Sequence, residues 1–169
     1  MKPRGVMAVS VVIIGFLAGS VGPGDAQQKS LKEQLVGTWL LSSTSEKRAD
    51  GADRWGASAK GVLVFDGTGR YVLVVNRGDL PKFAANRVDQ GTAEENQAVV
   101  RGMIATFGTY SVNEAEKMIV TQIEGGSFPN LHGGTQRRVI KVLSADELTY
   151  ANPATATGGT SEIRWKRAR

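Results

Sequence analysis

Short runs of β-forming residues, separated by turn sequences, recur along the chain from position 37 onward. The clearest case is an apolar run at 61–65, a Gly-rich turn at 66–69 and a second apolar run at 70–75. Two apolar runs on either side of such a turn predict a β-hairpin. Together with the weaker runs, the pattern predicts strands at 38–46, 61–65, 70–75, 105–112, 117–124, 135–143, 147–151 and 160–166.

The Ser/Thr-x-x-Glu motifs at 30–33 and 92–95 have the spacing of a helix capping box. In this motif each of the two polar side chains hydrogen bonds to the backbone N–H of the other residue. The first motif predicts a short helix over 31–36, and the second predicts a helix that ends near Met103. The second helix lies within 76–102, where the strand pattern lapses, and we interpret this stretch as an insertion and a candidate lid.

The predicted strands follow one another at short and fairly even spacing. No regular alternation of strands with helices points to a parallel sheet. An antiparallel sheet of this kind loses its exposed edges when it closes into a barrel. The sequence therefore predicts an all-β fold, an eight-stranded antiparallel up-and-down barrel with a short N-terminal helix and a helical insertion. A β-sandwich is the alternative. The interior of an eight-stranded barrel has room for about one small ligand.

The beginning of the chain has the composition of a secretory signal. Two basic residues precede an apolar run over 6–21, which is shorter than the roughly 20 residues of a comfortable membrane span. Helix-breaking and small residues follow at 22–26. We expect 1–26 to be a signal peptide and 27–169 to be one periplasmic or secreted domain, which meets the membrane only before cleavage. An uncleaved anchor is the alternative.

Composition excludes several kinds of chemistry. The 169 residues include no cysteine and one histidine, so disulfides, thiolate metal sites and cysteine nucleophiles are absent. His132 alone cannot form the usual zinc site, and no Gly-x-Ser-x-Gly motif indicates a serine hydrolase. We expect no metal and no cofactor. A formal net charge of +5 is too small to imply a nucleic-acid partner, and we interpret Arg137, Arg138 and Arg164 as parts of solvated outer faces.

Four segments, taken in order, resemble the bacterial lipocalin-like domain family. Gly37, Thr38 and Trp39 form the Gly-x-Trp motif that begins the first strand in lipocalins and related calycin barrels. The resemblance implies a calycin-type barrel, often exported or encoded with secondary metabolism, and no single agreed activity. The segments that carry it are 35–42, 61–71, 107–112 and 165–167.

Strand alternation predicts how the two ends of the barrel meet. Trp39 and Leu41 share one face of the first strand, and Trp165 and Arg167 share one face of the last. Because these strands are neighbours in a closed barrel, we expect Trp39 to stack under the Arg167 guanidinium and seal one end. Such a cation–π contact contributes about 0.5–2 kcal/mol. The resemblance implies the same arrangement, since an arginine near the last strand covers that tryptophan in lipocalins. Arg164 is the second candidate, and a solvated Arg167 is the alternative.

The same reasoning gives candidate ligand-binding residues. An inward tyrosine offers a ligand an apolar ring face and one hydroxyl group. We expect Glu124 to be a polar anchor at the mouth; the alternative is that these side chains fill the core or face solvent. The candidates are Tyr71, Leu73, Phe107, Tyr110 and Glu124.

The expected function is binding of a small, largely apolar molecule in the barrel cavity, with the mouth gated by 76–102. One alternative is an isomerase or cyclase on the same barrel that uses a buried carboxylate or tyrosine as general acid or base. Another is a packed barrel that serves as an envelope interaction module. Because the inward positions are mostly apolar or hydroxylic, binding is favoured over catalysis, and no catalytic residue is assigned.

Overall fold

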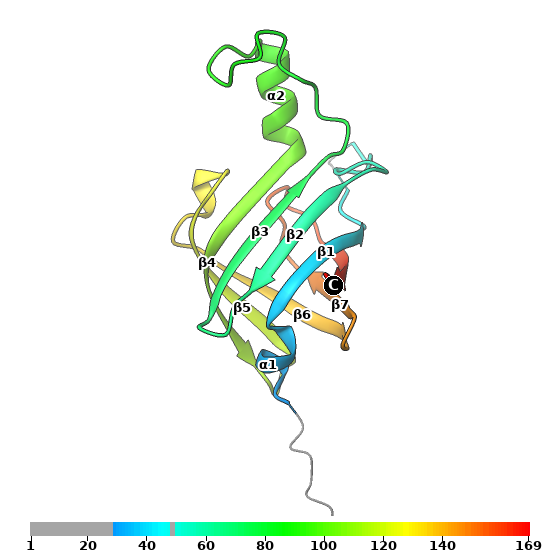
Figure 1. The fold of residues 1–169 in the computed structure, drawn as a ribbon, viewed down its shortest axis with the longest axis vertical. Helices are drawn as coiled ribbons and strands as arrows, with labels where there is room; N and C mark the ends of the chain where they lie inside the picture. Colours follow the sequence, from blue (N-terminus) through cyan, green and yellow to red (C-terminus); the bar gives the residue numbers. More distant parts are fainter. Residues whose placement is uncertain (1–28, 48–49) are drawn as a thin grey trace, which may run out of the picture.

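The computed structural model describes residues 29–47 and 50–169, and its strands form a closed barrel (Figure 1). The predicted signal peptide, 1–26, lies outside the described residues. Each strand pairs antiparallel with the next in chain order, so the prediction of an eight-stranded up-and-down barrel is confirmed and the sandwich alternative is wrong. The strands are β1 (Gly37–Thr44), β2 (Lys60–Phe65), β3 (Arg70–Asn76), β4 (Met103–Asn113), β5 (Met118–Gly126), β6 (Thr135–Leu143), β7 (Glu147–Asn152) and β8 (Ser161–Arg167).

Pairing of β1 with β8 closes the barrel. Trp39 lies opposite Arg167 and Leu41 lies opposite Trp165, with a register shift before Ser43. Since every strand has two partners, the sheet has no free edge for another chain to pair with. The expectation that the first and last strands lie side by side is therefore correct.

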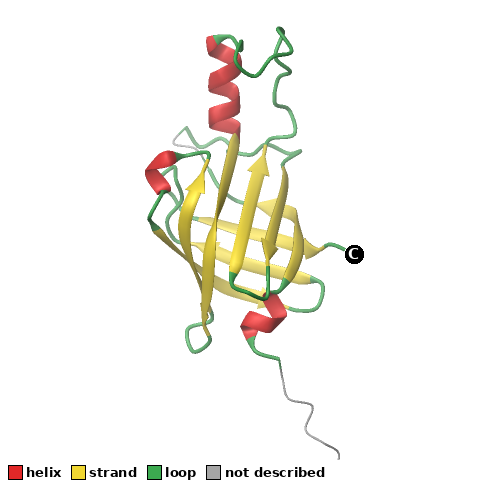
Figure 2. Ribbon diagram, turned by 60° about the vertical axis from the view of Figure 1, so that its left-hand side comes forward, coloured by secondary structure: helices red, strands yellow, loops and turns green. Residues whose placement is uncertain are grey.

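Both predicted capping boxes are present. They begin α1 (Leu31–Leu35) and α2 (Ala93–Gly102), each with reciprocal hydrogen bonds between the cap and the third helical residue. Helix α1 lies under one end of the barrel, whereas α2 continues directly into β4 and stands beyond the rim at the other end (Figures 1 and 2). A short 3-10 helix, η1 (Pro129–Leu131), lies in the loop between β5 and β6.

The interior at the α1 end is filled. Large side chains of β1, β2, β3, β4, β5, β7 and β8 meet there and are almost fully buried. Interiors packed in this way leave no room for a ligand. Any ligand space is therefore confined to the half of the barrel near the opposite rim. The residues of this packed end are Trp39, Phe65, Tyr71, Tyr110, Ile119, Leu148 and Trp165.

The Gly-x-Trp motif requires glycine at its first position for a steric reason. Gly37 has a φ of 137°, which L side chains rarely adopt, and a Cβ there would lie 2.5 Å from Nη1 of Arg167. The absent side chain lets the arginine lie over Trp39. The motif therefore belongs to the closure of the barrel rather than to a ligand site.

Candidate functional site

The end of the barrel next to α1 is sealed by Arg167 and Trp39. The guanidinium carbon of Arg167 lies 4.0 Å from the centroid of the Trp39 ring. Its Nη1 and Nη2 donate to the backbone carbonyls of Val36 at 2.8 Å and Gln34 at 2.7 Å, and Trp39 Nε1 donates to the carbonyl of Leu35 at 2.9 Å. The predicted contact is present, so a ligand can approach the interior only from the opposite end.

An internal cavity of about 50 Å³ lies in the half of the barrel near the open rim. One water molecule needs about 10–15 Å³ of such space, so the cavity has room for a few water molecules or one small chemical group. Its apolar wall includes Leu41, Leu73, Val75, Ile104 and Ile163, and its polar wall includes Thr106, Gln136, Arg138 and Tyr150.

Arg138, on β6, places a positive charge at this cavity. Its side chain is 4% exposed, and its guanidinium carbon lies 5.7 Å from the centroid of the Tyr150 ring. Nη1 donates to Thr121 Oγ1 at 2.8 Å, and Nη2 donates to Gln136 Oε1 at 2.7 Å. Within residues 29–47 and 50–169, no carboxylate forms an ion pair with Arg138. A buried ion is expensive unless it is paired, so this cation is only partly compensated.

Two hydroxyl groups in the cavity wall also lack partners. In the part of the chain that the structure describes, Thr106 Oγ1 and the Tyr150 hydroxyl are buried and form no hydrogen bond of good geometry, although the Trp165 and Arg138 side chains lie near the Tyr150 hydroxyl. Burial raises the pKa of Tyr150 above its ordinary value of 10.0, although the charge of Arg138 opposes this shift. The phenol is therefore protonated at neutral pH and remains a hydrogen-bond donor.

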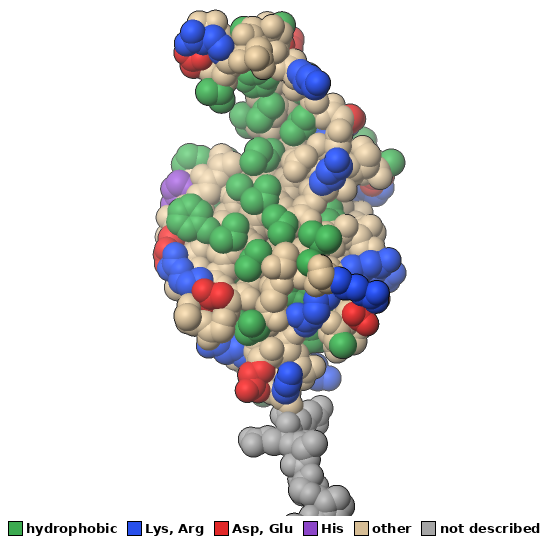
Figure 3. All heavy atoms as spheres, in the orientation of Figure 1, with side chains coloured by type: hydrophobic (Ala, Val, Ile, Leu, Met, Phe, Trp, Pro, Cys, Tyr) green, Lys and Arg blue, Asp and Glu red, His purple; other side chains and the backbone are tan. Residues whose placement is uncertain are grey.

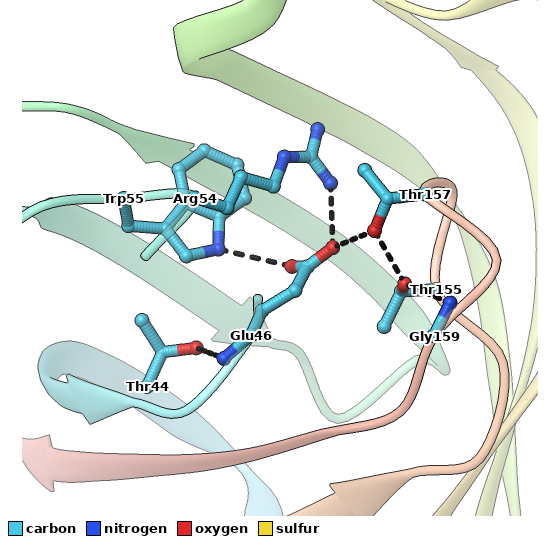
Figure 4. A network of polar contacts seen from close by, with 7 residues as sticks. All are labelled: Thr44, Glu46, Arg54, Trp55, Thr155, Thr157 and Gly159. Carbon is cyan, nitrogen blue, oxygen red and sulfur yellow. Dashed lines mark hydrogen bonds and ion pairs between the residues drawn. The ribbon is translucent and has the colours of Figure 1, made fainter. Parts of the chain in front are cut away.

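A buried polar network joins two loops at the rim of the barrel (Figure 4). Glu46, which follows β1, accepts hydrogen bonds from Arg54 at 2.8 Å and from Trp55 at 3.0 Å. It also accepts one from Thr157, in the β7–β8 loop, at 2.9 Å. The Arg54 guanidinium carbon lies 4.3 Å from the Trp55 ring centroid. The Glu46 charge is thus neutralised by Arg54, and the network fixes these two loops beside the cavity.

Sequence reasoning did not single out this network. Glu46 falls at the end of a predicted strand, and Arg54 and Trp55 lie in a loop without hydrophobic periodicity. Arg54 and Trp55 lie within nine residues of Glu46. The contact between positions 46 and 157 joins two loops more than a hundred residues apart in sequence. No local pattern could have indicated the contact with Thr157.

A larger apolar groove of about 620 Å³ lies outside the cavity, beside α2. Val99, Val100, Met103 and Phe128 give it an apolar wall. Residues that line both the groove and the inner cavity are Arg54, Ile104 and Ala156, so the two spaces adjoin.

Helix α2 forms one side of this groove. The 76–102 segment, predicted to be a lid, projects beyond the rim in this structure and does not cover the mouth (Figure 2). The groove is consequently an open apolar approach to the small polar cavity.

The candidate ligand-binding residues divide between three places. Leu73 lines the cavity. Tyr71 and Tyr110 point inward as expected but lie in the packed end, not in the cavity wall. The Tyr110 hydroxyl donates to the carbonyl of Asp66 at 2.8 Å, and its ring centroid lies 4.7 Å from that of Phe65. These two tyrosines therefore support the closed end.

Phe107 and Glu124 lie on the outer surface, contrary to the expectation that they contribute to the ligand site. Phe107 is 45% exposed because its neighbour Thr106 faces inward and side chains alternate along β4. Glu124 follows the inward Ile123 and forms a two-point ion pair with Arg70, at 2.6 and 2.8 Å. Figure 3 shows hydrophobic side chains gathered on this outer side of the barrel as well as on α2.

The interpretation of Arg138 as part of a solvated face is also wrong. Arg137 is exposed, but Arg138 is buried together with Ile140, and Gln136 lies on the same inner face. Alternation along β6 would have separated the two arginines, since neighbours in a strand point to opposite sides. The interpretation of Arg137 and Arg138 as one basic pair did not take this alternation into account.

The described residues, 29–47 and 50–169, contain neither a metal-binding cluster nor a membrane-spanning helix. No group of three or more His, Cys, Asp or Glu side chains there could hold a metal ion. No helix in these ranges has the length and apolar character needed to cross a membrane.

Comparisons with known proteins place the chain in a family. No curated protein matches the sequence. A lipocalin-like protein from Bacteroides uniformis has 16% sequence identity and a TM-score of 0.42, covering 80% of this chain and 99% of that one. A redesigned β-barrel has 13% identity and a TM-score of 0.44, covering 83% and 100%. The model of the lipocalin-like domain matches residues 36–168, which span the whole barrel. The chain therefore belongs to the lipocalin-like domain family.

Proposed function

We propose that this protein binds a small, largely apolar molecule at the open end of the barrel. The observation that carries the proposal is the junction of the apolar groove with the inner cavity at Arg54, Ile104 and Ala156. The groove, at about 620 Å³, falls in the range of roughly 300–1,000 Å³ typical of small-molecule sites. A ligand seated there would extend toward the interior from the side that is not sealed by Arg167.

Desolvation of the groove would supply most of the affinity. Val100, on α2, is 74% exposed, and Phe128, which also lines the groove, is 38% exposed. Exposed apolar side chains that converge on a concavity favour an apolar occupant, since each Å² removed from water contributes roughly 25 cal/mol. A neutral hydrocarbon body therefore fits the groove better than a highly charged molecule.

The chemistry of the inner cavity favours binding over catalysis. Glu46 is the carboxylate in its wall, and its two oxygens accept hydrogen bonds from Arg54, Trp55 and Thr157. A carboxylate occupied in this way is poorly placed to remove a proton from a substrate. The form of the enzyme alternative that uses a carboxylate consequently has no free base in this wall.

The binding proposal is tested with Nile red, a neutral apolar dye, and with 1-decanol as a competitor. We expect dye fluorescence to rise with the protein and to fall on addition of 1-decanol. Val100→Asp should weaken dye binding about tenfold, because it places a charge in the groove wall without disturbing the core. The matched control is Val72→Asp, on the outer face of β3, where the parent side chain is 44% exposed. Equal loss in both variants, or no displaceable dye, would overturn the proposal.

We propose in addition that the binding protein is exported to the periplasm or secreted. The support is the sequence of residues 1–26, with its basic start, apolar run and small residues before position 27. The full-length chain, expressed in a bacterium, should yield a product whose mass matches a chain that begins at Gln27. A product that keeps its N-terminus in the cytoplasmic fraction would contradict export and leave the binding proposal unaffected.

A further inference from the structure

We infer that the ligand carries a carboxylate group and that Arg138 binds it inside the barrel. This inference rests on the proposed binding function and specifies the chemistry of the ligand. In this arrangement the carboxylate occupies the small inner cavity, and the apolar body occupies the groove beside α2.

The first argument is the unused hydrogen-bonding capacity of Arg138. A guanidinium group has five N–H donors and no acceptor. Two donors are matched, by Thr121 and Gln136, and both of these acceptors are neutral. The side chain is 4% exposed, so bulk water does not solvate it freely. An anion in the adjoining cavity would supply the missing countercharge, and a carboxylate matches the planar shape of the guanidinium.

The second argument is that residues lining the same cavity have hydroxyl groups without hydrogen-bond partners. Thr106 and Tyr150 line it; Thr106 Oγ1 is buried without a hydrogen-bond partner among the described residues, and the buried Tyr150 hydroxyl, close to the Arg138 and Trp165 side chains, forms no hydrogen bond of good geometry there. A carboxylate accepts up to about four hydrogen bonds through its two oxygens. It therefore offers more acceptor sites to Arg138 and to neighbouring hydroxyls than an alcohol or a hydrocarbon does.

The third argument is the charge balance of the wall. The charged side chains that line the inner cavity are Glu46, Arg54 and Arg138, so the wall has a formal charge of +1. Glu46 and Arg54 form an ion pair at 2.8 Å with little exposure, which leaves Arg138 as the unbalanced charge. A cationic head group would be repelled, and a neutral one would leave Arg138 uncompensated.

The sizes of the two spaces indicate an amphiphilic ligand. The inner cavity, about 50 Å³, has room for a carboxylate but not for a bulky hydrocarbon. The groove, about 620 Å³, has an apolar wall and joins the cavity at Ile104. A monocarboxylic acid with an apolar chain or ring system fits both spaces. Its carboxylate would occupy the inner cavity, and its apolar body would occupy the groove.

The experiment compares decanoate with 1-decanol as competitors of Nile red at neutral pH. The two molecules have chains of equal length and differ in the charged end. We expect the full domain to bind decanoate about tenfold more tightly than 1-decanol, because a charge-assisted hydrogen bond is stronger than a neutral one. Arg138→Gln should remove this preference by weakening decanoate binding about tenfold while 1-decanol binding changes less than about twofold.

Two further variants separate binding from folding. Arg137→Gln changes the adjacent arginine, which is exposed on the outer face of β6, and should leave both affinities unchanged. Arg138→Lys keeps the charge and should retain part of the preference, and thermal unfolding of each variant checks that it is folded. If Arg138→Gln does not fold, the Lys variant and the unmodified domain still provide the comparison.

Each outcome decides the matter. Equal affinity of the unmodified domain for decanoate and 1-decanol would overturn the carboxylate inference and leave the binding function standing. A preference that survives in folded Arg138→Gln would overturn the role of Arg138. Failure of both molecules to displace the dye would overturn the proposed function for such ligands, and this inference with it.

Discussion

At the scale of single residues, the three arginines near the interior have different roles because their surroundings differ. Arg54 is neutralised by Glu46, and Arg167 lies on a tryptophan and donates to backbone carbonyls. Arg138 has only neutral acceptors among the described residues. The arginine side chain therefore has three uses here. Arg54 is half of an ion pair, Arg167 covers the sealed end of the barrel, and Arg138 is the proposed anion site.

The buried ion pair provides a residue-scale prediction. Glu46→Gln should lower the free energy of unfolding by about 3 kcal/mol, because it leaves the buried Arg54 charge without a partner. Chemical denaturation followed by tryptophan fluorescence measures this change. The control is Asp53→Asn, which removes an ion pair with Lys47 whose side chains are 59% and 58% exposed, and it should cost less than about 1 kcal/mol. Similar losses in the two variants would show that Glu46 does not stabilise the rim.

At the scale of elements, the two helices carry the same capping motif and yet contribute differently to the fold. Helix α1 is also held by Glu114, from the β4–β5 turn, which accepts from the backbone N–H groups of Leu31 at 3.0 Å and Lys32 at 3.2 Å. Leu35 is completely buried under the barrel. Helix α2 extends beyond the rim, and its only fully buried position is Gly102. One helix is part of the core, whereas the other is joined to it through β4.

The element-scale prediction follows from this difference. Ser30→Ala should lower the global free energy of unfolding by about 1 kcal/mol, because it removes the cap of a helix that is packed on the core. Thr92→Ala removes the equivalent cap of α2 and should leave the global value nearly unchanged. Hydrogen exchange measures the second effect, as faster exchange confined to 93–102. Equal global losses in the two variants would contradict this separation.

At the scale of the whole molecule, the barrel is closed by groups that lie far apart in the sequence. Arg167 reaches Val36 and Gln34 across 131 and 133 positions, in addition to covering Trp39. Closure satisfies the backbone groups of β1 and β8, which would otherwise be free edges. It also fills the α1 end and so decides at which end a ligand can enter.

Arg167→Ala is the whole-molecule prediction. It should lower the free energy of unfolding by about 2 kcal/mol, through loss of the cation–π contact and of charge-assisted hydrogen bonds to carbonyls. Arg164→Ala, on the outer face of the same strand, should change it by less than about 0.5 kcal/mol because that side chain is 52% exposed. Thermal unfolding of both variants checks the difference. If Arg167→Ala lowers the free energy of unfolding no more than Arg164→Ala does, the Arg167 contacts do not stabilise the barrel.

Local sequence patterns determined the strands, both helices and the barrel itself, because alternation and capping depend on residues that are close in sequence. Alternation also predicted the inward positions of Trp39 and Tyr71 and the approach of Arg167. Only the tertiary structure decided which inward residues fill the core and which line a cavity. Leu73 and Tyr71 share one face of β3, yet only Leu73 reaches the open half. The lack of a countercharge beside Arg138 was likewise decided by the fold, because it depends on what seven other strands place around that side chain.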